Sequence, residues 1–119
     1  MSVVVFLLAC IAGGFGAGLR YLVDVGVMAI TRGRFPWGII VVNITGSFAL
    51  GVVTASLPEA VFIVGAGLLG GYTTFSTSAL DAVALWRDGE RPASVLQIGV
   101  TLVASVIAAF AGLALGGLL

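Results

Sequence analysis

The stretch GGYTTFST, residues 70–77, lies inside a long run of apolar residues. It contains two glycines and four Ser or Thr side chains. Glycine weakens a helix, and a hydroxyl side chain can bind backbone groups that an interrupted helix exposes. If the surrounding run crosses a membrane, this is where its helix is most easily broken.

The composition places the chain in a membrane. Of its 119 residues 61% are hydrophobic and 8% are charged, whereas soluble domains carry roughly 25% charged residues. The charges leave four charge-free runs of 17, 24, 21 and 28 residues, at 3–19, 35–58, 60–80 and 92–119. A spanning helix needs about 20 mostly apolar residues, and the first run continues beyond Arg20. The sequence predicts an all-α membrane protein with one domain, 1–119, and four transmembrane helices at about 3–30, 36–56, 59–86 and 92–118.

Several other interpretations fit the sequence poorly. Residues 1–19 could be a signal peptide, but no basic segment precedes them and no cleavage site leads into a polar chain. The chain has no His and only Cys10, which excludes metal sites built from imidazole or thiolate. The Ser and Thr residues inside the runs have no base beside them, so we expect no enzyme. We also expect no nucleic-acid partner.

Polar residues within the apolar runs are candidate functional groups. Arg20 is costly at membrane depth unless it is paired or hydrated, and Asp24 lies on the same helical face four residues later. Arg20 could therefore pair with Asp24, supply positive potential at the mouth of an anion path, or do both. Asn43 must form hydrogen bonds, so it either joins helices or faces a watery pore.

The GGYTTFST stretch allows two structures. The helix can break between Gly71 and Phe75 and form an ion site, because irregular backbone is tolerated at membrane depth where it lines a cavity. Alternatively, the helix continues and its hydroxyls bond to neighbouring helices. No acidic residue lies in the centre of any run, which argues against a cation pathway. The remaining hydroxyl, amide and aromatic groups suit an anion.

Three motifs resemble the Fluc fluoride channels, also called CrcB proteins. They are GGFGAGLRY at 13–21, FPWGIIVVNITGSF at 35–48 and GLLGGYTTFST at 67–77, in the order that the family has them. The resemblance covers nearly the whole chain and implies a passive, fluoride-selective channel that releases cytoplasmic fluoride. It also implies an antiparallel, dual-topology dimer of four-helix subunits with two pores.

The resemblance assigns roles to particular residues. A structural sodium ion at the dimer centre would be held by the backbone carbonyls of Gly70 and Thr73. The fluoride path would be lined by Asn43, Phe75, Ser76, Thr77 and Ser105. Arg20, considered above because of its charge, would lie at the mouth of this path. The family pattern reads T-T-F-S-T-F, but this chain has Ser78 in place of the second phenylalanine, and Asp81 in place of a usual glutamate. Loss of that ring puts at least one pore in doubt.

The loop charges predict an orientation. The connections after the first and third helices carry Arg32, Arg34, Arg87 and Arg91, and the other side carries no Arg or Lys. This bias places those two loops in the cytoplasm and both termini outside. Because an antiparallel homodimer needs one sequence to insert both ways, we expect a homologous partner of opposite orientation.

Two other functions remain as alternatives. A small multidrug transporter has the same length and topology, but it needs a membrane-embedded glutamate in its first helix, which residues 3–30 lack. A non-conducting subunit that only packs against a partner is favoured by Ser78 and by the charge bias.

Overall fold

The computed structural model describes residues 2–33 and 35–119, and each element in this part of the chain is helical. Four segments are long and apolar enough to span a membrane, with mean hydropathies of 2.0, 1.9, 1.3 and 2.4. The all-α, four-span prediction is therefore confirmed, and the chain is a multi-pass membrane protein. The spans are Val3–Thr31, Trp37–Ser56, Pro58–Arg87 and Arg91–Gly116.

The third span is a composite of several short elements, whereas the other three are single helices. Three of the spans are α1 (Val3–Thr31), α2 (Trp37–Ser56) and α5 (Arg91–Gly116). The third begins with a 3-10 turn, η1 (Pro58–Ala60), and a π-helix, η2 (Val61–Leu69). It then continues as α3 (Gly70–Tyr72) and α4 (Phe75–Arg87).

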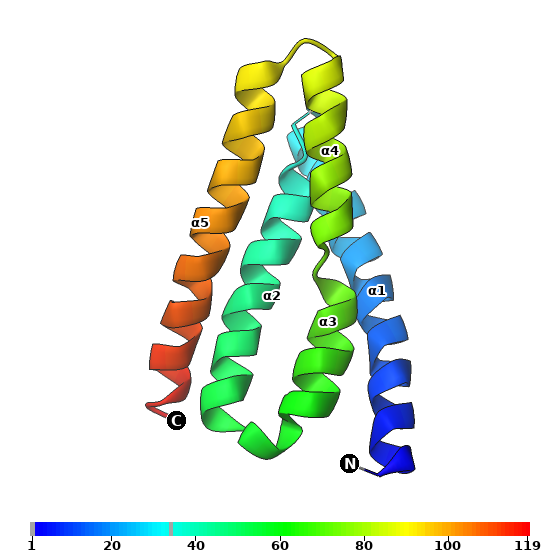
Figure 1. The fold of residues 1–119 in the computed structure, drawn as a ribbon, viewed down its shortest axis with the longest axis vertical. Helices are drawn as coiled ribbons and strands as arrows, with labels where there is room; N and C mark the ends of the chain where they lie inside the picture. The colour runs from blue at the N-terminus through cyan, green and yellow to red at the C-terminus, as the bar shows by residue number, and fades with distance from the viewer. Residues whose placement is uncertain (1, 34) are drawn as a thin grey trace.

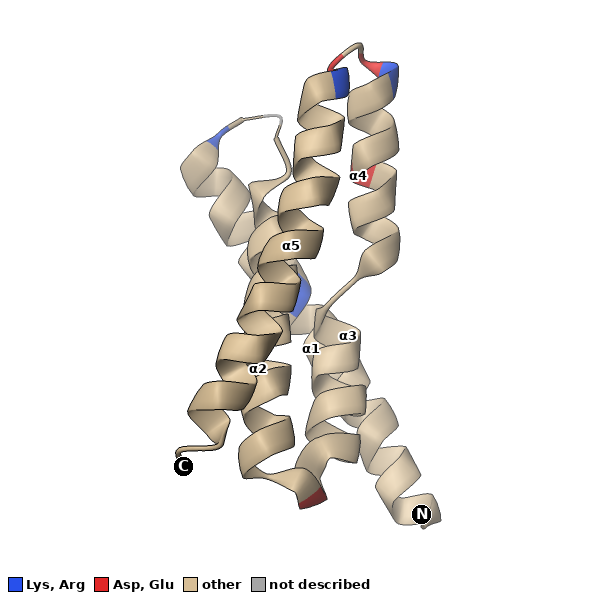
Figure 2. Ribbon diagram, turned by 60° about the vertical axis from the view of Figure 1, so that its left-hand side comes forward, with Lys and Arg blue, Asp and Glu red and all other residues tan. Residues whose placement is uncertain are grey.

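The helices lie side by side with both termini at one end (Figure 1). The turn between α2 and η1 is at this same end, and the α1–α2 and α4–α5 connections are at the other. Charged residues gather at the α4–α5 end, as Figure 2 shows. Arg87 ends α4 and Arg91 begins α5, and Arg32 follows α1. The remaining arginine of the loop-charge prediction, Arg34, lies outside the described residues.

Local sequence signals mark where α1 begins and ends and where α4 turns into α5. The Ser2 hydroxyl accepts a bond from the Val5 N–H at 3.1 Å and caps α1. Arg32 closes α1 in the left-handed conformation, with φ of 52°. Gly89, with φ of 82°, makes the tight turn from α4 to α5, a conformation that glycine adopts without steric cost.

Glycines allow two close helix contacts. A side chain at Gly112 of α5 would overlap the Phe48 carbonyl of α2, and one at Gly51 of α2 would overlap the α5 backbone. On the other side, a side chain at Gly71 would overlap the Gly13 carbonyl of α1. Small residues let backbones approach in this way within membranes. The third span is thereby fixed against α1, with α2 and α5 packed together beside it.

Candidate functional site

The third span changes direction at Thr73 and Thr74, two residues with extended backbone. Their φ and ψ angles are −80° and 158°, and −152° and 124°. The Thr73 N–H still donates to the Leu69 carbonyl at 2.9 Å, which ends the helical ladder below. The Thr74 hydroxyl accepts from the Thr77 N–H at 3.2 Å and caps α4 above. The sequence T-T-F-S-T thus supplies the start signal of a new helix within the span.

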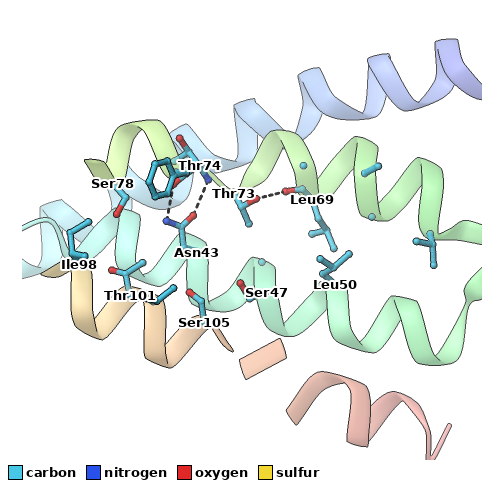
Figure 3. Close-up of a pocket in the computed structure, with 17 residues that line it drawn as sticks. Asn43, Ser47, Leu50, Leu69, Thr73, Thr74, Ser78, Ile98, Thr101 and Ser105 are labelled. Atoms are coloured by element: carbon cyan, nitrogen blue, oxygen red, sulfur yellow. Dashed lines mark hydrogen bonds between the residues drawn. The ribbon is translucent and has the colours of Figure 1, made fainter. Parts of the chain in front are cut away.

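Asn43 of α2 holds this extended segment (Figure 3). Its Nδ2 donates to the Thr74 carbonyl at 2.9 Å, and its Oδ1 accepts from the Thr74 N–H at 2.9 Å. One amide side chain therefore satisfies both backbone groups of Thr74, with its nitrogen as the donor and its oxygen as the acceptor. Of the two roles considered for Asn43, the structure shows the first, because Asn43 joins two helices; it also lines the cavity described below.

Two N–H groups of this segment donate to side chains and not to the carbonyl groups that a helix would offer them. In a continuous helix the Thr74 N–H would donate to the Gly70 carbonyl and the Thr77 N–H to the Thr73 carbonyl. Here the Thr74 N–H donates to Asn43 and the Thr77 N–H donates to the Thr74 hydroxyl. The Gly70 and Thr73 carbonyl oxygens are thus freed from their usual helical donors.

A cavity of about 630 Å³ lies beside this segment, between α2, the third span and α5. Its wall is mostly apolar and includes no carboxylate among the described residues. Phe75 belongs to the wall although its side chain is 83% exposed in the single chain. The polar residues of the wall are Asn43, Ser47, Thr73, Thr74, Ser78, Thr101 and Ser105.

The structure places some of the expected site residues in the cavity wall and others outside it. Five line the cavity: Asn43, Gly70, Thr73, Phe75 and Ser105. Ser76 and Thr77 are not part of this wall; their hydroxyls lie 3.5 Å and 3.3 Å from the Thr74 hydroxyl in the first turn of α4.

Arg20 also lies away from the cavity wall, half-buried on α1. It forms no salt bridge with Asp24 within residues 2–33 and 35–119, so the pairing considered from the sequence is absent there. Asp24 instead packs against the second residue of α2, where its Oδ1 lies over Gly38. Its carboxylate therefore sits at the positive end of the α2 dipole.

Two polar residues of α5, Gln97 and Thr101, join Ser105 on one face of the helix and were not singled out in the sequence. Gln97 is completely buried, and Thr101 is 8% exposed. Gln97 Oε1, Thr101 Oγ1 and Ser105 Oγ are buried and have no hydrogen-bond partner in the described chain. The spacing of four between residues 97, 101 and 105 was the available signal, since it places three polar residues on one face of an apolar helix.

Fold and cavity together define an all-helical membrane protein in which a mostly apolar cavity, with a few hydroxyl and amide groups in its wall, lies beside an interrupted span. Residues 7–113 match the family model described as CrcB-like protein, Camphor Resistance (CrcB). The chain belongs to this family, which confirms the resemblance seen in the three motifs.

Known relatives cover nearly the whole chain. A protein of Agrobacterium fabrum named "Fluoride-specific ion channel FluC" is 44% identical over 92% of this chain and 93% of its own length. Proteins with the same name from Mesorhizobium japonicum and Chelativorans are 41% and 35% identical over 92% and 90% of this chain, and over 90% and 91% of their own.

Proposed function

We propose that this protein is a fluoride-selective passive channel that releases cytoplasmic fluoride and so reduces its toxicity. The observation that carries the proposal is a cavity with hydroxyl and amide groups, and no carboxylate among its described wall residues, in a chain whose relatives are named fluoride-specific channels. The protein is a channel and not an enzyme.

Its chemistry suits a small anion. Fluoride is strongly hydrated, so a path for it must offer donors that replace water, and hydroxyl and amide N–H groups do so. Asn43, Phe75 and Ser105 contribute to the path from the cavity wall. Ser76 and Thr77 contribute from the first turn of α4, where the helix dipole adds positive potential. Arg20 adds charge near the mouth.

A structural sodium ion would be held by the Gly70 and Thr73 carbonyls. The residues present fit this ion, because sodium prefers oxygen ligands and both carbonyls have lost their usual helical donors to Asn43 and Thr74. The interruption of the third span at Thr73 and Thr74 is, on this proposal, a built feature of the channel. When bound, the ion supplies a fixed positive charge beside the path.

The channel is proposed to be an antiparallel dimer of multi-pass subunits in the cell membrane. Large apolar side chains are exposed on the single chain, among them Phe15 (70%), Phe75 (83%) and Phe110 (68%), which lipid and a partner chain would cover. Arg32, Arg87 and Arg91 at one end favour cytoplasmic α1–α2 and α4–α5 loops, with both termini outside. A homologous partner of opposite bias is therefore favoured over a second identical copy.

The test is fluoride efflux from liposomes that contain the purified chain, with chloride efflux as the control. Fast fluoride release without chloride leak from this chain alone would establish the channel and overturn the heterodimer. If this chain alone gives no efflux, but co-expression with a homologue of opposite charge bias restores it, both the channel and the heterodimer are supported. If there is no fluoride efflux with or without the homologue, a non-conducting packing subunit is favoured.

A further inference from the structure

Gln97 is the largest completely buried polar side chain within the described residues, and its amide nitrogen contacts one residue, Ser78. Its Nε2 lies 2.9 Å from Ser78 Oγ and 3.3 Å from the Ser78 carbonyl oxygen. Because a carbonyl oxygen can only accept, this contact favours the orientation in which the amide nitrogen faces Ser78. In that orientation Gln97 donates to the Ser78 hydroxyl oxygen.

This bond leaves the proton of Ser78 available. In a helix a serine hydroxyl commonly donates to the carbonyl four residues earlier, here that of Thr74. That carbonyl accepts from Asn43 Nδ2 at 2.9 Å, and the Ser78 hydroxyl does not donate to it. Within residues 2–33 and 35–119 the Ser78 hydroxyl donates to no acceptor, although the residue is only 3% exposed. A hydroxyl that already accepts a hydrogen bond is also a stronger donor.

Ser78 points this donor into the cavity, from α4 toward the α5 face that carries Thr101 (Figure 3). The Thr101 and Ser105 hydroxyls on that face are buried and have no partner in the described chain. Buried polar groups in native proteins are almost always paired. Three hydroxyls without acceptors therefore lie beside one cavity, and a bound species that accepts hydrogen bonds would satisfy them.

We propose that the Ser78 hydroxyl, held in place by Gln97, is a hydrogen-bond donor to fluoride in the cavity. Ser78 contacts the anion, and Gln97 is a positioning residue that acts through it. The inference rests on the proposed channel function and assigns part of its selectivity to this pair. A hydroxyl donates strongly to fluoride, whereas the larger chloride ion gains less from a single fixed donor.

The test measures fluoride efflux against fluoride concentration for Ser78→Ala, Ser78→Thr and Gln97→Leu. For Ser78→Ala we expect the half-saturating fluoride concentration to rise roughly 10- to 100-fold, the effect of losing one hydrogen bond to a charged group. Ser78→Thr keeps the hydroxyl and should stay close to the parent. Gln97→Leu should resemble Ser78→Ala, and the double variant should be no worse than either single one, because both act on the same contact.

Ser94→Ala is the matched control. Ser94 is a buried serine of α5 that donates to the Ala82 carbonyl of α4 at 2.7 Å, and it does not line the cavity. Its loss should lower the melting temperature without changing the fluoride dependence. If Ser78→Ala behaves like Ser94→Ala, the pair is only structural and the proposal fails.

A second readout separates this inference from the channel function. The melting temperature of the full chain in detergent is measured in sodium fluoride and in sodium chloride at equal concentration. Stabilisation by fluoride in the parent that Ser78→Ala removes would support the site even if no transport occurs. Equal stabilisation in both proteins, or none in the parent, would show that the Ser78 hydroxyl does not bind fluoride and would overturn the proposal.

Discussion

The replacement Asn43→Leu tests whether one side chain maintains the extended segment. Leucine has a similar size but leaves the Thr74 N–H and carbonyl without the partners that Asn43 now supplies. Hydrogen bonds between membrane helices average roughly 0.6 kcal/mol and reach about 1.7, so two of them contribute about 1–3 kcal/mol. A loss of about 2 kcal/mol changes the ratio of extended to rearranged segment by about 30-fold. We therefore expect fluoride efflux to slow about tenfold or more, and the melting temperature to fall.

Thr54→Val is the control for the Asn43 experiment. Thr54 lies on the same helix, is exposed, and donates only to the Leu50 carbonyl of its own helix at 2.7 Å. Efflux and melting temperature should change little in this variant. Amide hydrogen exchange supplies a direct readout, because the Thr74 N–H should exchange faster in Asn43→Leu. If Asn43→Leu has the same efflux rate, melting temperature and Thr74 exchange rate as the parent, the role given to the Asn43 amide is refuted.

Three further predictions follow from the packing, the freed carbonyls and the loop charges. Gly112→Ala should lower the free energy of thermal unfolding by about 1–3 kcal/mol, because the added methyl group overlaps the Phe48 carbonyl. Gly99→Ala is the control: its methyl group meets no atom within 4 Å, so this variant should be neutral or stabilising. Exchange of sodium for choline should lower the melting temperature by several degrees, because an ion that binds only the folded state stabilises it; equal melting curves would count against a sodium site. In a Cys10→Ser background, Gly33→Cys should react with an impermeant thiol reagent only from the cytoplasmic side, and equal labelling from both sides would contradict the single orientation.

The four spans were predictable because charge and hydropathy alone determine which segments can enter a bilayer. Charge-free runs of the length of a bilayer have few alternatives to a helix. The π-helical winding of Val61–Leu69 was not predictable, since it carries the same apolar composition as an ordinary helix. Within this segment Gly67 lies against Ala9 of α1, a contact between distant parts of the chain that no local pattern reveals.

The candidate site was only partly predictable for a similar reason. Asn43 stands out because an amide in an apolar run must find partners, but its partner Thr74 is 31 residues away and no local pattern reveals it. Gln97 was missed because its importance comes from contact with Ser78 of another helix. Ser78 appeared as the loss of an aromatic ring, whereas in the structure it is a hydroxyl held by a buried amide.

The bonds between Asn43 and Thr74 also constrain the order in which the chain can assemble. The chain is made from the N-terminus onward, so α2 leaves the ribosome before Thr74 does. An extended segment that arrived without Asn43 would expose two unsatisfied backbone groups to lipid, at a cost of several kcal/mol. The third span is therefore expected to enter as a continuous helix, or to wait beside the insertion machinery, and to adopt its interrupted form only after docking on α2. Biogenesis of this protein would then depend on a folding step completed within the membrane.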